Sequence, residues 1–571
     1  IVGNPPFIGS KRMRKRLSSP YVDALRTAYH DLSGEIDFVT YWWARSAELV
    51  TRGRARSFGL ITTKTIAQSS NRSVIRRYLD AGEHGLRLAF AIPNHPWHDP
   101  ETTASVRIAM TVGVKGEGQG RLSTIKSERR RKREAVLEFE NQLGAINIDL
   151  TVGPNVASAK PLKANSGICW MGVKMSGDGF KFGPEDRAKF LKAGVPEHRM
   201  PMVIAGTDIT EAQSETFAFD FFDVASADDL LHEYPVAFQH LYDHVKPERD
   251  ENDREQYRLN WWRFAETRPR LRNSVRELDR YIVTSETSSH RFFKFTSADG
   301  MLADGSVIVI ASDDAYVLGL VSSHAHVAWA LRAGGRMGAG DDPRYQNEVC
   351  FDPFPFPDTS DEALKSRIRD VAEKLDALRK DVLARHEDLT LTKLYNTLEA
   401  LCAAEAAGAV LLEKERDVAE RGCVSLIRQY HDEIDTAVAE AYRWPGDLSD
   451  EEILERLVAL NKERAAEEAK RKVRWLRSEF QAPAYVAPAE QEKLALPEAE
   501  RPSAEVLEWP DALPEQVVAV ASVVARSGKP VAAKDVARAF KGKRASTVTP
   551  VLDALAGMGR VRKLEDGRYA A

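Results

Sequence analysis

The sequence has few cysteines and no long apolar run, and these absences exclude several classes of protein. Its four cysteines, at positions 169, 350, 402 and 423, form no Cys-x-x-Cys pair. Neither a structural zinc site nor a disulfide framework is therefore expected. The longest apolar stretches, such as residues 517–525, are far too short to span a bilayer. We predict a protein of the reducing cytoplasm with no metal site and no membrane partner.

The composition that remains is that of a folded protein with several domains. The chain has 571 residues, 43% of them hydrophobic and 29% charged, which is ordinary for a protein with a buried core. This length predicts about three or four domains. The net charge of −4 is uninformative, but residues 510–571 carry +5, and residues 121–134 hold seven basic and two acidic side chains. Such local patches are what a phosphate backbone recognises.

The chain opens with Ile rather than Met, and Ile1 and Val2 are typical of the last residues of a strand. We expect the chain to be a fragment whose N-terminal portion is missing.

Residues 1–115 alternate between strand and helix patterns. Apolar periodicity predicts strands at residues 57–63, 86–92 and 105–114, and helices at residues 38–50 and 73–80. This alternation indicates an α/β layer architecture.

The rest of the chain divides into four further segments. Residues 116–358 predict a mixed α/β domain that ends in the proline-rich stretch 351–357. Residues 359–480 predict a helical region interrupted near residues 444–447, and the prolines of residues 481–510 predict a linker. Residues 511–571 predict a winged helix, with helices at 517–526, 533–540 and 545–558 followed by a β-hairpin wing.

Asn4, Pro5, Pro6 and Phe7 form the motif with the clearest chemistry. The two prolines stiffen the loop and supply no N–H group, so the Asn4 side-chain oxygen and the Pro5 carbonyl become fixed acceptors for a planar amine. Phe7 offers a face on which an extruded base can stack. Methyl transfer from a sulfonium to such an amine needs positioning and electrostatics rather than a metal. The alternative is a plain turn at the end of a strand.

In this context the motif resembles motif IV of amino-methyltransferases, which serve DNA adenine, RNA bases or protein amides. The surrounding sequence resembles MmeI-like adenine-specific DNA methyltransferases of restriction-modification type, strongest at residues 1–115 and 280–358. The matching segments are residues 3–12, 37–43, 59–63, 104–110, 321–324, 329–331, 344–345 and 351–357.

This resemblance implies a fold and a function. Residues 1–115 would be the C-terminal half of a Rossmann-like class I methyltransferase domain, and residues 116–358 a target-recognition domain with a connecting insertion. The expected reaction is transfer of a methyl group from S-adenosylmethionine to N6 of a flipped adenine in double-stranded DNA. The expected context is restriction-modification or anti-phage defence, with other subunits of such a system as further partners.

The cofactor loop of this family lies upstream of motif IV, so we expect it upstream of Ile1 and assign no cofactor-binding residue. Two glycine-rich stretches in the chain are poor substitutes. Residues 116–120 predict a hairpin turn, because a strand pattern rather than a helix follows them, and residues 338–340 precede Asp-Asp-Pro.

Several side chains are candidates for contacts with DNA. Trp97 is a second stacking face or, alternatively, a packed aromatic. The basic run at residues 129–133 contacts phosphates or, alternatively, begins a solvated helix. Residues 69–72 form a polar loop that contacts the substrate or, alternatively, is only solvated. The further cations that we expect at DNA phosphates or base edges are Arg129, Arg131, Arg291, Arg344, Lys543, Arg544, Arg562 and Lys563.

Two rival functions stay open on the sequence. The first is a DNA-binding or scaffold subunit without catalysis. The second is a protein or RNA amino-methyltransferase, which predicts no large recognition domain after the catalytic one.

Overall fold

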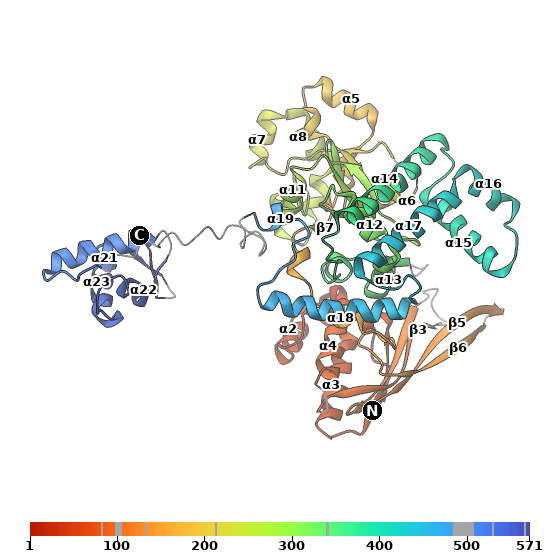
Figure 1. Cartoon of the computed structure of the whole chain (residues 1–571), viewed down its shortest axis with the longest axis horizontal. Helices are drawn as coiled ribbons and strands as arrows, with labels where there is room; N and C mark the ends of the chain where they lie inside the picture. The colour runs from red at the N-terminus through yellow and green to blue at the C-terminus, as the bar shows by residue number, and fades with distance from the viewer. Residues whose placement is uncertain are drawn as a thin grey trace. The chain divides into compact units, whose positions relative to one another are not determined.

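The computed structural model describes residues 1–81, 84–97, 106–131, 134–211, 214–337, 342–483, 507–527, 530–564 and 567–570. The chain forms two compact units, Ile1–Pro483 and Ala484–Ala571, which are described separately (Figure 1). The architecture is mixed α/β, as the sequence predicts. No helix within the described residues combines the length and the apolar character needed to cross a membrane.

The first part of unit 1 is a six-stranded sheet in the order β1-β2-β4-β3-β5-β6. β1 is parallel to β2, and β3 is parallel to β5, while the other neighbours are antiparallel. β5 and β6 run side by side as a long two-stranded ribbon (Figure 1). The strands are β1 (Val2–Gly3), β2 (Ser57–Thr63), β3 (Leu86–Trp97), β4 (Val106–Lys115), β5 (Gly120–Arg131) and β6 (Glu134–Gly144).

The predicted elements of this sheet region are present, with three corrections. Residues 69–72 are the first turn of a helix and not a loop, and the strand predicted at 86–92 continues to Trp97. The glycines at 116–120 connect β4 to β5, but these two strands do not pair, because β3 lies between them. The helices are α1 (Met13–Leu17), α2 (Ser19–Ala28), α3 (Phe38–Thr51) and α4 (Ser69–Leu79), with short 3₁₀ turns at Ser10–Arg12 and Lys64–Ala67.

α3 packs on the sheet through its apolar side. Trp43 is fully buried, donates from Nε1 to Thr111 Oγ1 at 3.1 Å and lies edge-on against Phe58 at 5.1 Å. Gly113 faces the same ring, and a Cβ there would lie 2.3 Å from it. The glycine therefore makes the room that the two aromatic rings occupy.

Two four-stranded sheets follow, in the orders β12-β11-β14-β7 and β13-β9-β10-β8. Their strands are β7 (Cys169–Met171), β8 (Lys181–Phe182), β9 (Met202–Ile204), β10 (Phe217–Ala218), β11 (Arg280–Ser285), β12 (Lys294–Ser297), β13 (Met301–Ala303) and β14 (Val307–Ile310). A small hairpin adds β15 (Gly335–Met337) and β16 (Asp342–Arg344). The helices of this part are α5 (Pro184–Lys192), α6 (Gly206–Thr210), α7 (Ala227–Glu233), α8 (Pro235–His244), α9 (Lys246–Asp250), α10 (Glu255–Leu259), α11 (Pro269–Val275), α12 (Ala315–Ser322) and α13 (His324–Ala333).

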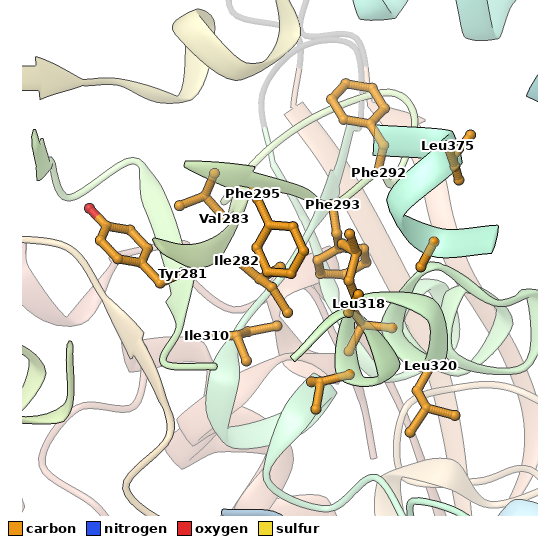
Figure 2. Packing of buried hydrophobic residues seen from close by; sticks show 14 of the residues in the cluster. Tyr281, Ile282, Val283, Phe292, Phe293, Phe295, Ile310, Leu318, Leu320 and Leu375 are labelled. Atoms are coloured by element: carbon orange, nitrogen blue, oxygen red, sulfur yellow. The ribbon is translucent and has the colours of Figure 1, made fainter. Parts of the chain in front are cut away.

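The helical region shares its core with the first of these sheets. Ile368 and Leu375 belong to the same buried cluster as Ile282 and Ile310. Figure 2 shows Phe293 and Phe295 of this cluster between the strands and the helices that carry Leu318 and Leu375. The sequence prediction of long helices, interrupted near residues 444–447, is confirmed by α14 (Glu362–Arg385), α15 (Leu391–Ala407), α16 (Glu413–Arg421), α17 (Val424–Tyr442), α18 (Asp450–Ala469) and α19 (Ser478–Gln481).

The described residues of unit 2 form three helices and a two-stranded sheet around a core of their own. Val520, Val548 and Leu552 are fully buried there. The elements are α21 (Leu513–Ser527), α22 (Ala533–Ala537), α23 (Ala545–Gly557), β17 (Arg562–Lys563) and β18 (Tyr569–Ala570). Their order is the predicted one, and the assignment as a winged-helix domain stays a prediction. Residues 484–506 of the expected linker lie outside the described residues.

Candidate active site and nucleic-acid interface

The Asn4–Phe7 loop begins where β1 ends. Because β1 and β2 are parallel, the loop shares one edge of the sheet with the turn at Lys64–Ala67 that follows β2. The Asn4 side chain is exposed and makes no hydrogen bond with any residue that the structure describes. Phe7 is half-buried. The loop thus presents a free amide group beside an aromatic face.

Asp37 ties this loop to its surroundings. Its Oδ1 accepts the Ser10 N–H at 3.0 Å, and its Oδ2 accepts the Thr65 hydroxyl at 2.9 Å and the Asn71 side-chain amide at 3.0 Å. Asn71 in turn accepts from the Asp37 N–H at 2.8 Å and from Thr40 at 2.9 Å. The Asp37 carboxylate and the Asn71 amide therefore connect the residue after the motif loop, Ser10, with the start of α3 and the start of α4.

Sequence reasoning missed this pair. Asp37 stands at the N-cap position of α3, where Asp is common because its oxygen accepts helix N–H groups. Within the described part of the chain it makes no such capping bond and accepts from residues 28 and 34 positions away instead. The motif-like stretch at 37–43 was a signal for Asp37, and the polar residues at 69–72 were a signal for Asn71.

Trp97 ends β3, on the same edge of the sheet as the motif loop. The strand order places β2 and β4 between β1 and β3, which separates the two strands by about 14 Å at ordinary strand spacing. The sheet therefore does not bring Trp97 beside Phe7. Its role as a stacking face stays a prediction, and the neighbouring His98 lies outside the described residues.

A cavity of about 500 Å³ opens between residues 1–152, here called the catalytic segment because they include the candidate motif, and residues 227–358, here called the recognition segment after the domain predicted there. One wall comes from the turn after β2, the start of α4 and the end of β3. The other wall comes from the end of α13 and the hairpin after it. The polar side chains that line it include Lys64, Gln68, Arg72, Asn94, Asp149, Arg332, Arg336, Gln346 and Glu451.

Arg291 and Arg344, two of the cations that we expect at DNA, form hydrogen bonds with other residues of the protein. Arg291 is buried and donates to Thr284 Oγ1 at 3.1 Å, to the Pro343 carbonyl at 3.1 Å and to the Ser285 carbonyl. These bonds from Nη1 and Nη2 link two loops of the protein, and a contact of Arg291 with DNA stays a prediction. Arg344 donates from Nε and Nη2 to Glu286 Oε1 at 2.8 and 2.6 Å and so forms an ion pair within the protein. Its contact with DNA stays a prediction.

The first three residues of the basic run, 129–131, belong to a strand and not to the start of a helix. Arg129 and Arg131 belong to β5 and pair with Val136 and Glu134 of β6. Residues 132 and 133, and the side chains of Arg129 and Arg131, lie outside what the structure describes. Their contact with phosphates stays a prediction.

The cations expected at DNA in unit 2 lie on its surface. Lys543 and Arg544 are exposed and precede α23, with Lys543 5.8 Å from the ring of Trp509. Arg562 and Lys563 are exposed on β17, where Lys563 forms an ion pair with Asp553 at 2.7 Å. The structure thus gathers exposed cations before α23 and on the hairpin that follows it.

The glycine-rich stretch at residues 116–120 does not fit a nucleotide-type cofactor. Gly116 and Gly118 have positive φ in the turn before β5, and a Cβ on Gly120 would lie 2.0 Å from the Leu88 carbonyl. These glycines serve a turn and strand packing, and no helix begins after them. Residues 338–340 lie outside the described residues. No group of side chains arranged to hold a metal ion occurs among the residues that the structure describes.

Comparisons with known proteins extend the picture. The family model of the MmeI DNA-methyltransferase domain matches residues 1–125, and that of the MmeI target recognition domain matches residues 227–358. DNA methyltransferase A of Bacillus subtilis (strain 168) is 22% identical over 473 residues, covering 81% of this chain and 47% of that protein. The chain therefore spans about half the length of this curated relative.

The fold of this chain is also similar to that of a solved structure. The type IIL restriction-modification enzyme MmeI in complex with DNA matches with a TM-score of 0.62 at 18% identity, over 82% of this chain and 57% of that chain. The catalytic and recognition segments of the sequence both find their counterparts in one family. The resemblance of this chain to MmeI-like DNA methyltransferases is thereby confirmed.

Proposed function

We propose that this chain supplies the catalytic loop and the target-recognition segment of an adenine-specific DNA methyltransferase of a restriction-modification or related defence system. The observation that carries the proposal is the Asn4 side chain, exposed and without a partner among the described residues at the carboxyl end of β1. It stands in a segment that matches a DNA-methyltransferase domain. A target recognition domain follows in the same chain, which favours DNA over protein or RNA as the substrate.

The roles of the motif residues follow from their chemistry. Asn4 Oδ1 and the Pro5 carbonyl would accept the two hydrogens of the adenine amine. Pro6 would fix the loop, and Phe7, half-buried beside them, would stack on the extruded base. S-adenosylmethionine, the donor that the family implies, would supply the methyl group. We assign no residue of this chain to its binding.

The test is Asn4→Ala in the intact protein, with Asn260→Ala as a matched control. Asn260 is half-buried on unit 1, and its amide donates to the Gln256 carbonyl. Loss of one preorganised acceptor costs about 2.7–4 kcal/mol of transition-state stabilisation, which lowers the methylation rate about 10²–10³-fold. DNA binding should stay close to wild type.

Methylation is measured with a tritiated donor, and digestion of the product DNA to nucleosides identifies the methylated base by mass spectrometry. Asn260→Ala should methylate at the wild-type rate. An Asn4→Ala rate within a few fold of wild type would refute the role of the motif. Methyl groups on cytosine rather than on N6 of adenine would refute the proposed specificity.

A further inference from the structure

Arg72 has a feature that the catalytic motif does not explain. It lies in the first turn of α4, directly after Asn71, and lines the cavity between the catalytic and recognition segments. Its guanidinium makes no hydrogen bond or ion pair with any residue that the structure describes. Burial lowers the pKa of Arg72, and the nearby Asp149 opposes that shift only in part. Arg72 is thus a half-buried cation that faces a cavity without a partner among the described residues, and an anion in the cavity would stabilise it.

The opposite wall of the cavity presents a second arginine. Arg332, near the end of α13, uses Nη2 to donate to the Val152 carbonyl at 3.0 Å, while its buried Nε has no acceptor among the described residues. Among the described residues, the cavity is lined by the cations Lys64, Arg72, Arg332 and Arg336 and by the carboxylates Asp149 and Glu451. Both walls therefore contribute an arginine, Arg72 from one side and Arg332 from the other.

The two walls approach each other closely. Gly335 lies at the turn after α13, and a Cβ on it would stand 3.4 Å from Gln346 Oε1 and 3.9 Å from Gln68 Cδ. Gln68 precedes α4 in the catalytic segment. A ligand in the cavity would thus touch catalytic and recognition residues at once.

The chemistry of the lining selects the ligand class. Among the lining residues that the structure describes, the polar groups are guanidinium, ammonium, amide, hydroxyl and carboxylate groups, and none of these residues carries an aromatic ring. The cationic groups suit a sugar-phosphate backbone, and the described lining offers a nucleobase or the adenosine of a cofactor no stacking partner. Asn71, the residue before Arg72, is bonded to Asp37, which holds the motif loop. Arg72 therefore follows directly on the residue that joins α4 to Asp37, and Asp37 in turn binds the Ser10 N–H just after the motif loop.

We propose that Arg72, with Arg332 from the facing wall, binds a phosphodiester of the DNA strand that carries the target base. This inference rests on the proposed function. The contact would fix the backbone of that strand relative to the Asn4 loop and close the recognition segment over it. Arg72 is in this sense a positioning residue and takes no part in the methyl transfer itself.

The experiment measures binding of the full chain to a fluorescein-labelled 30-base-pair duplex by anisotropy, over a series of salt concentrations. Arg72→Ala should weaken binding about 5- to 10-fold at low salt and reduce the log–log salt slope by about 0.9, the value for one lost phosphate contact. Arg72→Lys should retain the slope because it keeps the charge, and Arg332→Ala should lower it like Arg72→Ala. Arg77→Ala is the control, since Arg77 lies on the same helix in an exposed ion pair with Asp31.

The outcomes separate this inference from the proposed function. If the wild-type chain binds duplex and Arg72→Ala and Arg332→Ala, folded by circular dichroism, bind with the wild-type slope, the inference fails and the function stands. If the wild-type chain binds no duplex even at low salt, both fail. Inorganic phosphate is the second arm: if it stabilises the chain against heat in an Arg72-dependent manner while DNA affinity is independent of Arg72, the cavity is a site for a small anion instead.

Discussion

Replacing Asp37 by Ala tests whether one carboxylate holds the catalytic loop in place. Three donors lose their acceptor: the Ser10 N–H, the Thr65 hydroxyl and the Asn71 amide, at 3.0, 2.9 and 3.0 Å. Removing a hydrogen bond to a charged group costs about 1.5–3 kcal/mol. Because Asp37 is only half-buried, water replaces part of this loss. We expect a decrease of about 2–4 kcal/mol in the free energy of unfolding of unit 1.

The assay combines urea unfolding with hydrogen exchange. Exchange should accelerate in peptides that cover residues 4–12 and 64–72, because the Ser10 amide and the first turn of α4 lose their anchor. Asp37→Asn, which keeps the shape and one acceptor oxygen, should lose about half as much stability. Asp31→Ala is the control, since its exposed ion pair with Arg77 contributes at most about 1 kcal/mol. Equal losses for Asp37→Ala and Asp31→Ala, or unchanged exchange at residues 4–12, would refute the reasoning.

Three further predictions concern packing, pH and unit 2. Gly113→Ala should destabilise unit 1 by about 1–3 kcal/mol in urea unfolding, because the new Cβ would lie 2.3 Å from the buried Phe58 ring; wild-type stability would show that the ring moves freely. Burial lowers the pKa of His326 to about 3, so the stability it contributes is complete above pH 6.5 and is lost as the pH falls toward 3. The stability difference between wild type and His326→Gln should therefore fall by about 1.4 kcal/mol per pH unit between pH 6 and 4, and a constant difference would contradict the burial argument. The double variant Lys543→Ala/Arg544→Ala of the full chain should reduce the salt slope of duplex binding by up to about 1.8; an unchanged slope would favour a protein-binding role for unit 2.

The sequence alone determined the local elements and the chemistry of the motif. Period-two and period-3.6 patterns depend on near neighbours, so β2 matches the predicted strand and α3 differs by one residue at its end. The consecutive prolines of the Asn4–Phe7 motif limit the loop by covalent geometry, whatever surrounds it. The helices of residues 359–480 follow in the same way from residue types that favour helix.

Tertiary structure decided which of these elements meet. The pairing of β3 with both β4 and β5 could not be read from the glycines at 116–120, because strand order depends on contacts distant in sequence. Arg291 is a candidate DNA contact in the sequence, and only the folded chain shows that it is buried and bonded to two loops. Asp37 and Asn71 are 34 positions apart in the sequence and form a hydrogen bond. Arg72 and Arg332 are 260 positions apart and line the same cavity. A sequence pattern reports what a residue is, and only the folded chain determines whether its polar atoms face a partner, solvent or an empty cavity.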